Sequence, residues 1–218
     1  MPQRLLRIVI LITLEVFILA LPSLIMKYKK KQDQASKSKK TASIVAATFT
    51  YFLSGAFVLI KEQLFVNYVL LILILMLSAI IVIVDTRCRI IPNICLFPML
   101  ILSAVYLIYN TAIGAEWVNI VFSIISMIMM CIGLIVLTAA LHFQGYLGAG
   151  DIKYLSVGAF LFGFSNRIVG MLAGIVISMA AYLVPMFIAK KLTMKSFIAF
   201  GPFIGFGMMC GICWQYFL

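Results

Sequence analysis

The chain has 218 residues, of which 65% are hydrophobic and only 11% are charged, and its formal net charge is +11. Apolar runs of about 17 to 25 residues follow one another and leave too little polar sequence for the surface of a water-soluble protein. Composition therefore predicts an integral membrane protein. Because the runs are long and unbroken rather than short and alternating, we expect an all-α, polytopic fold.

In chain order, the apolar runs predict eight transmembrane helices in a single domain covering residues 1–218. The first run has spanning length and no small-x-small cleavage site, so it predicts a retained helix rather than a signal peptide. The sixth run is only about a dozen residues long, or about 18 Å as a helix, against a hydrocarbon core of about 30 Å. The expected spans lie near residues 5–26, 41–60, 67–84, 94–109, 118–141, 152–164, 168–189 and 200–217.

Lysine and arginine residues predict the orientation, because cytoplasmic loops of membrane proteins are enriched in them. The loop 27–40 carries seven lysines, and alternation of the spans puts thirteen basic residues on its side and four on the other. We therefore expect this loop in the cytoplasm and both termini outside. The charge lies in loops without interleaved aromatic side chains, which favours membrane lipid and not nucleic acid as its partner.

The cysteines do not form a recognisable metal site. Cys210 and Cys213 form a CxxC pair inside the last expected span, but no second pair and only one histidine, His142, accompany it. A structural zinc ion needs about four ligands, so we expect small packing residues and no bound metal or cofactor.

Three of the six acidic residues have unremarkable positions. Asp33 lies in the lysine loop, and Glu62 and Glu116 lie in short outer loops, where solvated charges are expected. Glu15 lies in the middle of the first span, where an ionisable group is costly, so it is a candidate for packing or substrate contact.

The remaining two acids, Asp85 and Asp151, have related positions. Asp85 ends the third span and Asp151 opens the sixth, and two whole spans separate them, so both should lie at the cytoplasmic face. We expect Gly148 and Gly150 to shape the loop that carries Asp151, by adopting conformations closed to other residues or by allowing close approach of backbone.

The segment after Asp85 is predicted to be a helix break. Pro92 ends the preceding helical register, and Asn93 is expected as the N-cap of the fourth span. Two carboxylates brought together in a partly desolvated site share one proton, as in aspartic proteases. One carboxylate activates water and the other polarises the peptide carbonyl, without a metal ion or a nucleophilic side chain.

Three segments, in this order, resemble the type IV prepilin peptidase family, which consists of polytopic aspartic proteases with a GxGD signature. They are DTRCRIIPN at 85–93, GAGDIKYL at 148–155 and FGPFIGFG at 200–207. The resemblance implies an endopeptidase that removes the basic leader from type IV prepilins or pseudopilins at the cytoplasmic face of the cytoplasmic membrane. It implies that Asp85 and Asp151 are the catalytic residues.

Long members of this family insert a cytoplasmic domain with two CxxC pairs, associated with N-methylation, after their first span. This chain has only residues 27–40 there, with no cysteine, which predicts a peptidase without methyltransferase activity. Lys153 is expected to tune the catalytic pair or hold lipid phosphate, and Gly201 and Pro202 to pack near the site.

Other interpretations remain open at this point. Intramembrane carboxylates also mark ion pathways, so a proton-coupled transporter is an alternative, although no internal repeat is evident. An inert membrane scaffold would use the two aspartates as helix caps. An archaeal-type preflagellin peptidase, or a relative of the presenilin-like GxGD enzymes, would keep the chemistry and change the substrate.

Overall fold

The computed structural model describes residues 6–16, 18, 22, 37–62, 64–140, 148–188, 199–214 and 216, and these residues contain helices and no strands. Residues 6–16 are helical. The helices that follow are α2 (Lys37–Lys61), α3 (Phe65–Cys88), α4 (Asn93–Ala112), α5 (Val118–Ala140), α6 (Ala149–Phe162), α7 (Asn166–Ile188) and α8 (Gly201–Trp214). The predicted all-α fold is confirmed.

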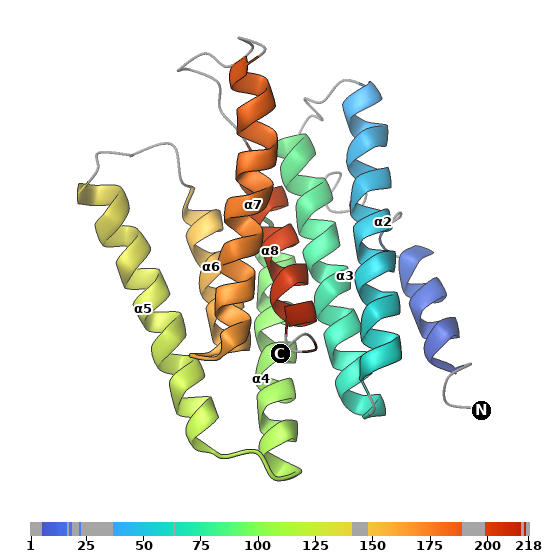
Figure 1. Ribbon diagram of the computed structural model, residues 1–218, viewed down its shortest axis with the longest axis vertical. Coiled ribbons are helices and arrows are strands. Elements are labelled where there is room, and N and C mark those ends of the chain that lie inside the picture. Colours follow the sequence, from blue (N-terminus) through green and yellow to red (C-terminus); the bar gives the residue numbers. More distant parts are fainter. Residues whose placement is uncertain are drawn as a thin grey trace.

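Successive helices run in alternate directions along one bundle (Figure 1). As a result, the last turn of α3 and the first turns of α4, α6 and α8 lie at the same end. The C-terminal ends of α4 and α6 and the N-terminal ends of α5 and α7 lie at the opposite end. Four of these helices, α3, α4, α5 and α7, are long and apolar enough to cross a membrane.

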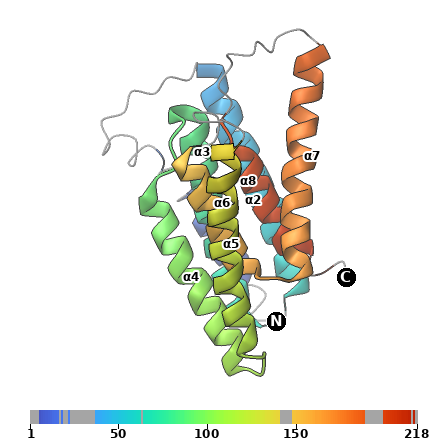
Figure 2. The ribbon, with the colours of Figure 1, turned by 90° about the vertical axis from the view of Figure 1, so that its left-hand side faces the viewer.

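Helix α3 forms the centre of the bundle. The most apolar 18-residue segment of α3 has a mean hydropathy of 2.9, and 78% of it is buried. The equally apolar segment of α5 is only 11% buried. Helices α2, α4 and α8 pack around α3, while α5 packs mainly against α6 at the edge of the bundle (Figure 2). The apolar side chains of α5 therefore face outward, as expected for a helix in contact with lipid.

Helix α6 is short, as the sequence predicts. Its 14 residues would span about 21 Å, against about 30 Å for a hydrocarbon core. Nevertheless its side chains are buried without interruption from Tyr154 to Phe162. A short helix surrounded by protein does not need to match the thickness of the membrane, so its first turn can lie below the ends of its neighbours.

Helices α7 and α8 pack closely through glycines on both helices. A Cβ atom on Gly174 would lie 2.8 Å from Cβ of Cys210, and a Cβ atom on Gly207 would lie 2.6 Å from the carbonyl oxygen of Met171. The expected packing role of Cys210 is thus confirmed at this contact. The glycines hold α8 in place, and α8 begins at the candidate site.

The predicted helix limits from α2 onward agree with the structure within four residues. Two differences matter for function: α3 continues to Cys88, beyond the expected end at 84, and α6 begins at Ala149, before the expected start at 152. Both aspartates are therefore inside the terminal turns of helices. The rest of the first predicted span, most of loop 27–40, and His142 lie outside the described residues.

Glu62 is not simply the solvated charge that the sequence predicts. Its Oε2 atom accepts a hydrogen bond from the Tyr216 hydroxyl (2.8 Å), and its backbone carbonyl accepts one from the Arg7 guanidinium (2.5 Å). Arg7 lies over the rings of Phe65 and Tyr68. These contacts connect the helical residues 6–16, the end of α2, the start of α3 and Tyr216. They lie at the end of the bundle opposite Asp85.

Candidate active site

Asp85 lies in the last turn of α3 and is only 4% exposed. Its Oδ2 atom accepts a hydrogen bond from the backbone N–H of Gly201, the first residue of α8 (2.9 Å). Helix α3 ends three residues later, because Arg89 adopts the left-handed conformation (φ 52°) and its N–H donates to the Asp85 carbonyl. Arg89 is also close enough to act electrostatically on the Asp85 carboxylate.

The short distance between Asp85 and the backbone of α8 requires a glycine at position 201. A Cβ atom at position 201 would lie 2.7 Å from Oδ2 and 2.9 Å from Cβ of Asp85. The backbone N–H reaches the carboxylate because no side chain stands between them. Pro202 follows in the first turn of α8, where its missing N–H removes no helical hydrogen bond. Gly201 therefore lies against Asp85, while Pro202 lines a small recess with Val82 and Phe206.

Asp151 lies in the first turn of α6 and is partly exposed. Its Oδ2 atom accepts a hydrogen bond from the backbone N–H of Gly148 (2.9 Å). Both aspartates thus accept a hydrogen bond from the N–H of a glycine at the start of a helix. A carboxylate at this position also interacts favourably with the helix dipole.

Gly148 and Gly150 act by close packing and not by unusual backbone angles. Gly148 is extended (φ −76°, ψ 152°), and the glycines with positive φ among the described residues are Gly114 and Gly163. A Cβ atom on Gly150 would lie 3.0 Å from Cβ of Ile91. Ile91 belongs to the connection that follows Asp85, so this contact holds the start of α6 against the end of α3.

The structure brings the two carboxylates to one end of the bundle, and Asp151 is close enough to act electrostatically on Asp85. One carboxylate is buried and the other is partly accessible to water. Such a pair has the two groups that acid–base hydrolysis needs, a base for water and an acid for the carbonyl oxygen. No group of three or more potential metal ligands occurs among the described residues.

A model of the type IV leader peptidase family matches residues 69–184, more than half of the chain. The chain belongs to this family. The matched range includes both aspartates and ends before Gly201. No curated protein and no solved structure gives a significant match. Membership favours the peptidase hypothesis over the transporter and the scaffold.

Two of the predicted supporting residues make no hydrogen bond or ion pair with Asp85 or Asp151 among the described residues. The exposed Lys153 and Asn93 line an apolar recess of about 570 Å³ between α4, α5 and α6. The prediction that Asn93 caps α4 is wrong, because Pro92 occupies the N-cap position in an extended conformation and no side chain caps the helix. Since the fixed φ of proline suits the residue before a helix, the helix starts without a polar cap.

Tyr154 and Ser78 were missed by the sequence reasoning. Their hydroxyl groups form a hydrogen bond (2.5 Å), and both residues are 0% exposed. Tyr154 lies one helical turn after Asp151, and Ser78 lies two turns before Asp85, so the bond connects the two helices that carry the aspartates. Asp85 also acts electrostatically on the Tyr154 hydroxyl. The spacing of each residue from its aspartate places it on the same side of the helix. This pattern would have predicted the bond only if α3 and α6 had been known to be neighbours.

Proposed function

We propose that the peptidase is an aspartic endopeptidase that cleaves the basic leader from type IV prepilins or pseudopilins, with Asp85 and Asp151 as its catalytic pair. The observation that carries the proposal is the convergence of the two carboxylates at one end of the bundle, each hydrogen-bonded to a glycine N–H. Membership in the leader peptidase family supplies the reaction class. The resemblance of the three motifs supplies the substrate.

In this mechanism one carboxylate removes a proton from water while the water oxygen attacks the carbonyl carbon of the scissile peptide. The other carboxyl group, which is protonated, donates a hydrogen bond to the carbonyl oxygen as negative charge develops there. Proton transfer to the peptide nitrogen then breaks the C–N bond, which releases the amine of the mature protein and the carboxylic acid of the leader, and this acid then ionises in water. The pair ends the cycle with the one shared proton with which it began.

The direct test is co-expression of the peptidase with a candidate prepilin, followed by mass measurement of the pilin. Asp85→Asn and Asp151→Asn keep the size of each side chain and remove its acid–base function, so each should abolish leader removal. Glu116→Gln is the matched control, since Glu116 is exposed at the opposite end, and it should cleave normally. Complete processing by either aspartate variant would contradict the assignment.

We also propose that the active site faces the cytoplasm and that the protein resides in the cytoplasmic membrane. The support is the distribution of basic residues, with thirteen on the side of loop 27–40 and four on the other side. Because the leader is basic and this face of the enzyme is basic too, long-range charge attraction does not explain recognition. The apolar segment of the substrate then supplies the binding energy by packing within the membrane.

We further propose that residues 1–218 form one peptidase domain without methyltransferase activity. The loop 27–40 contains no cysteine, in contrast to the CxxC-bearing domain of long family members. The intact mass of a pilin cleaved by the purified enzyme, in the presence of a methyl donor, tests this. The expected mass is that of the unmethylated product, and an increase by one methyl group would contradict the proposal.

A further inference from the structure

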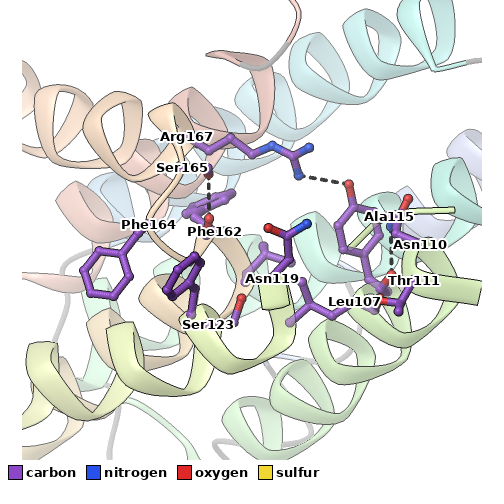
Figure 3. A pocket seen from close by; sticks show the side chains of 14 residues that line it. Leu107, Asn110, Thr111, Ala115, Asn119, Ser123, Phe162, Phe164, Ser165 and Arg167 are labelled. Atoms are coloured by element: carbon purple, nitrogen blue, oxygen red, sulfur yellow. Dashed lines mark hydrogen bonds between the residues drawn. The ribbon is translucent and has the colours of Figure 1, made fainter. Parts of the chain in front are cut away.

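A cavity of about 240 Å³ lies at the end of the bundle opposite Asp85 and Asp151, among the ends of α4, α5, α6 and α7 (Figure 3). It is separate from the catalytic pair, and the proposed function uses none of its residues. Half of its lining side chains are polar: Tyr106, Asn110, Thr111, Asn119, Ser123, Ser165 and Arg167. Such a polar cavity at the ends of transmembrane helices lies where the headgroup region of a bilayer is expected.

Arg167 gives the cavity a positive charge. It is the one ionisable side chain among the lining residues apart from Tyr106, and no lining residue is acidic. Its Nη1 atom donates a hydrogen bond to the Tyr106 hydroxyl (3.0 Å), and its guanidinium lies 6.0 Å from the centre of the Tyr106 ring. Tyr106 is only 4% exposed, so it holds the guanidinium in place. The remaining N–H groups of the guanidinium have no acceptor among the described residues.

Ser123 supplies a second observation that points to a ligand. It is only 2% exposed, and its hydroxyl has no hydrogen-bond partner within the described part of the chain, whereas the neighbouring Ser126 donates to the Gly163 carbonyl. The hydroxyl oxygen itself is not fully enclosed, because Ser123 lines the cavity, so a bound group can reach it. Gly163 has a φ of +58°, and a Cβ atom there would lie 2.9 Å from the Ser123 hydroxyl oxygen, so the glycine keeps this oxygen accessible.

These groups converge on one space. Figure 3 shows the side chains of Ser123 and Asn119, from α5, beside the recess, with Arg167, from the start of α7, extending across it. Phe122 and Phe164 form an edge-to-face pair next to the cavity and are 46% and 55% exposed. The cavity therefore combines a fixed cation and unpaired polar groups with an apolar rim.

We propose that this cavity binds a phosphate group, with Arg167 as the cationic contact and Ser123 and Asn119 as hydrogen-bond donors. A planar guanidinium matches the geometry of phosphate oxygens. The phosphate comes either from a lipid headgroup, whose acyl chains would contact the apolar rim, or from free phosphate in solution. A bound lipid would link α5, which packs mainly on α6, to α4 and α7.

The experiment uses the full-length peptidase in detergent. Native mass spectrometry measures retention of phosphatidylglycerol, with the phosphate-free lipid diacylglycerol as reference, and thermal unfolding with added inorganic phosphate forms a second arm. Arg167→Gln should reduce phosphatidylglycerol retention about tenfold, because it removes a charge-assisted contact. Ser123→Ala should reduce it to a smaller extent. Lys61→Gln is the control, since Lys61 is an exposed cation at the same end that does not line the cavity.

A lipid source predicts retention of phosphatidylglycerol over diacylglycerol and no effect of inorganic phosphate. A free anion predicts a rise in the melting temperature of the wild type, but not of Arg167→Gln, with inorganic phosphate. Equal responses of the wild type, Arg167→Gln and Ser123→Ala in both arms would overturn the proposal. If Arg167→Gln does not fold, the response of Ser123→Ala tests the proposal by itself, because removal of one hydroxyl oxygen leaves the helix contacts intact. A wild-type response of Ser123→Ala would then overturn the proposal.

Discussion

The contact between Asp85 and Gly201 is the tightest constraint on a single residue of the site. Gly201→Ala would place a methyl carbon only 2.7 Å from Asp85 Oδ2, which is too close unless one of the two groups shifts. The hydrogen bond from the Gly201 N–H would lengthen or break. Because a hydrogen bond to a charged group contributes about 1.5–3 kcal/mol, we expect kcat for leader cleavage to fall by about tenfold or more.

The matched control for this substitution is Gly133→Ala on α5, where an added Cβ would meet no atom within 4 Å. Alanine is favoured over glycine in a helix by about 0.5–1 kcal/mol, so this variant should be as stable as the wild type or slightly more stable. Cleavage assays and melting temperatures of both variants, measured in the same detergent, separate an effect on Asp85 from a general effect of glycine replacement. Wild-type activity of Gly201→Ala would contradict the role of this contact.

Residue patterns singled out the two aspartates as candidate site residues, but they did not predict the groups that form hydrogen bonds with them. Asp85 and Asp151 were identifiable because a carboxylate beside a long apolar run is costly unless it has a function. The contact of Asp85 with Gly201 joins positions 116 residues apart, and no local pattern encodes such a separation. Asn93 shows the opposite error: its residue type is typical of an N-cap, but the preceding proline already occupies that position.

At the level of helices, the bond between Tyr154 and Ser78 sets how α6 lies against α3. Tyr154→Phe would remove the hydroxyl and leave Ser78 without its partner in a buried site. We expect kcat to fall about tenfold with little change in KM, because the bond orients the aspartates and does not touch substrate. Tyr109→Phe is the control, since the Tyr109 hydroxyl has no hydrogen-bond partner within the described ranges.

A double-mutant cycle with Ser78→Ala isolates this interaction. If the two hydroxyl groups act through each other, the double variant should lose little more activity than Tyr154→Phe alone, and the coupling free energy should be about 0.5–3 kcal/mol. Fully additive effects on kcat would show that the two residues act independently.

The glycine contact between α7 and α8 is the second prediction at this level. Gly207→Ala would bring a methyl group to 2.6 Å from the Met171 carbonyl oxygen, and backbone cannot move aside as a flexible side chain can. Overpacking of this kind costs about 1–3 kcal/mol, so we expect a lower melting temperature than for Gly133→Ala. Because α8 begins at Gly201, cleavage should weaken as well. An unchanged melting temperature would show that the two helices separate easily.

Helix limits were predicted well because an apolar run of spanning length has few other structures available in lipid. The short sixth helix was predicted for the same reason. What the run lengths could not supply is which helices are neighbours: the central position of α3 and the edge position of α5 depend on packing, although both helices are equally apolar. The site depends on these neighbours, since α3, α6 and α8 each contribute one part of it.

At the scale of the whole molecule, the distribution of charge predicts which end of the bundle meets the cytoplasm. The side of the sequence that carries Asp85, Asp151 and loop 27–40 has thirteen of the seventeen basic residues, and such asymmetry sets the orientation of polytopic proteins. Ala35→Cys should therefore be protected from a membrane-impermeant maleimide in intact cells, whereas Glu116→Cys, at an exposed position of the opposite end, should react. The unmodified protein measures the background from its five native cysteines. Labelling of Ala35→Cys but not Glu116→Cys would reverse the orientation and place Asp85 and Asp151 at the outer face, where a leader that stays in the cytoplasm could not reach them.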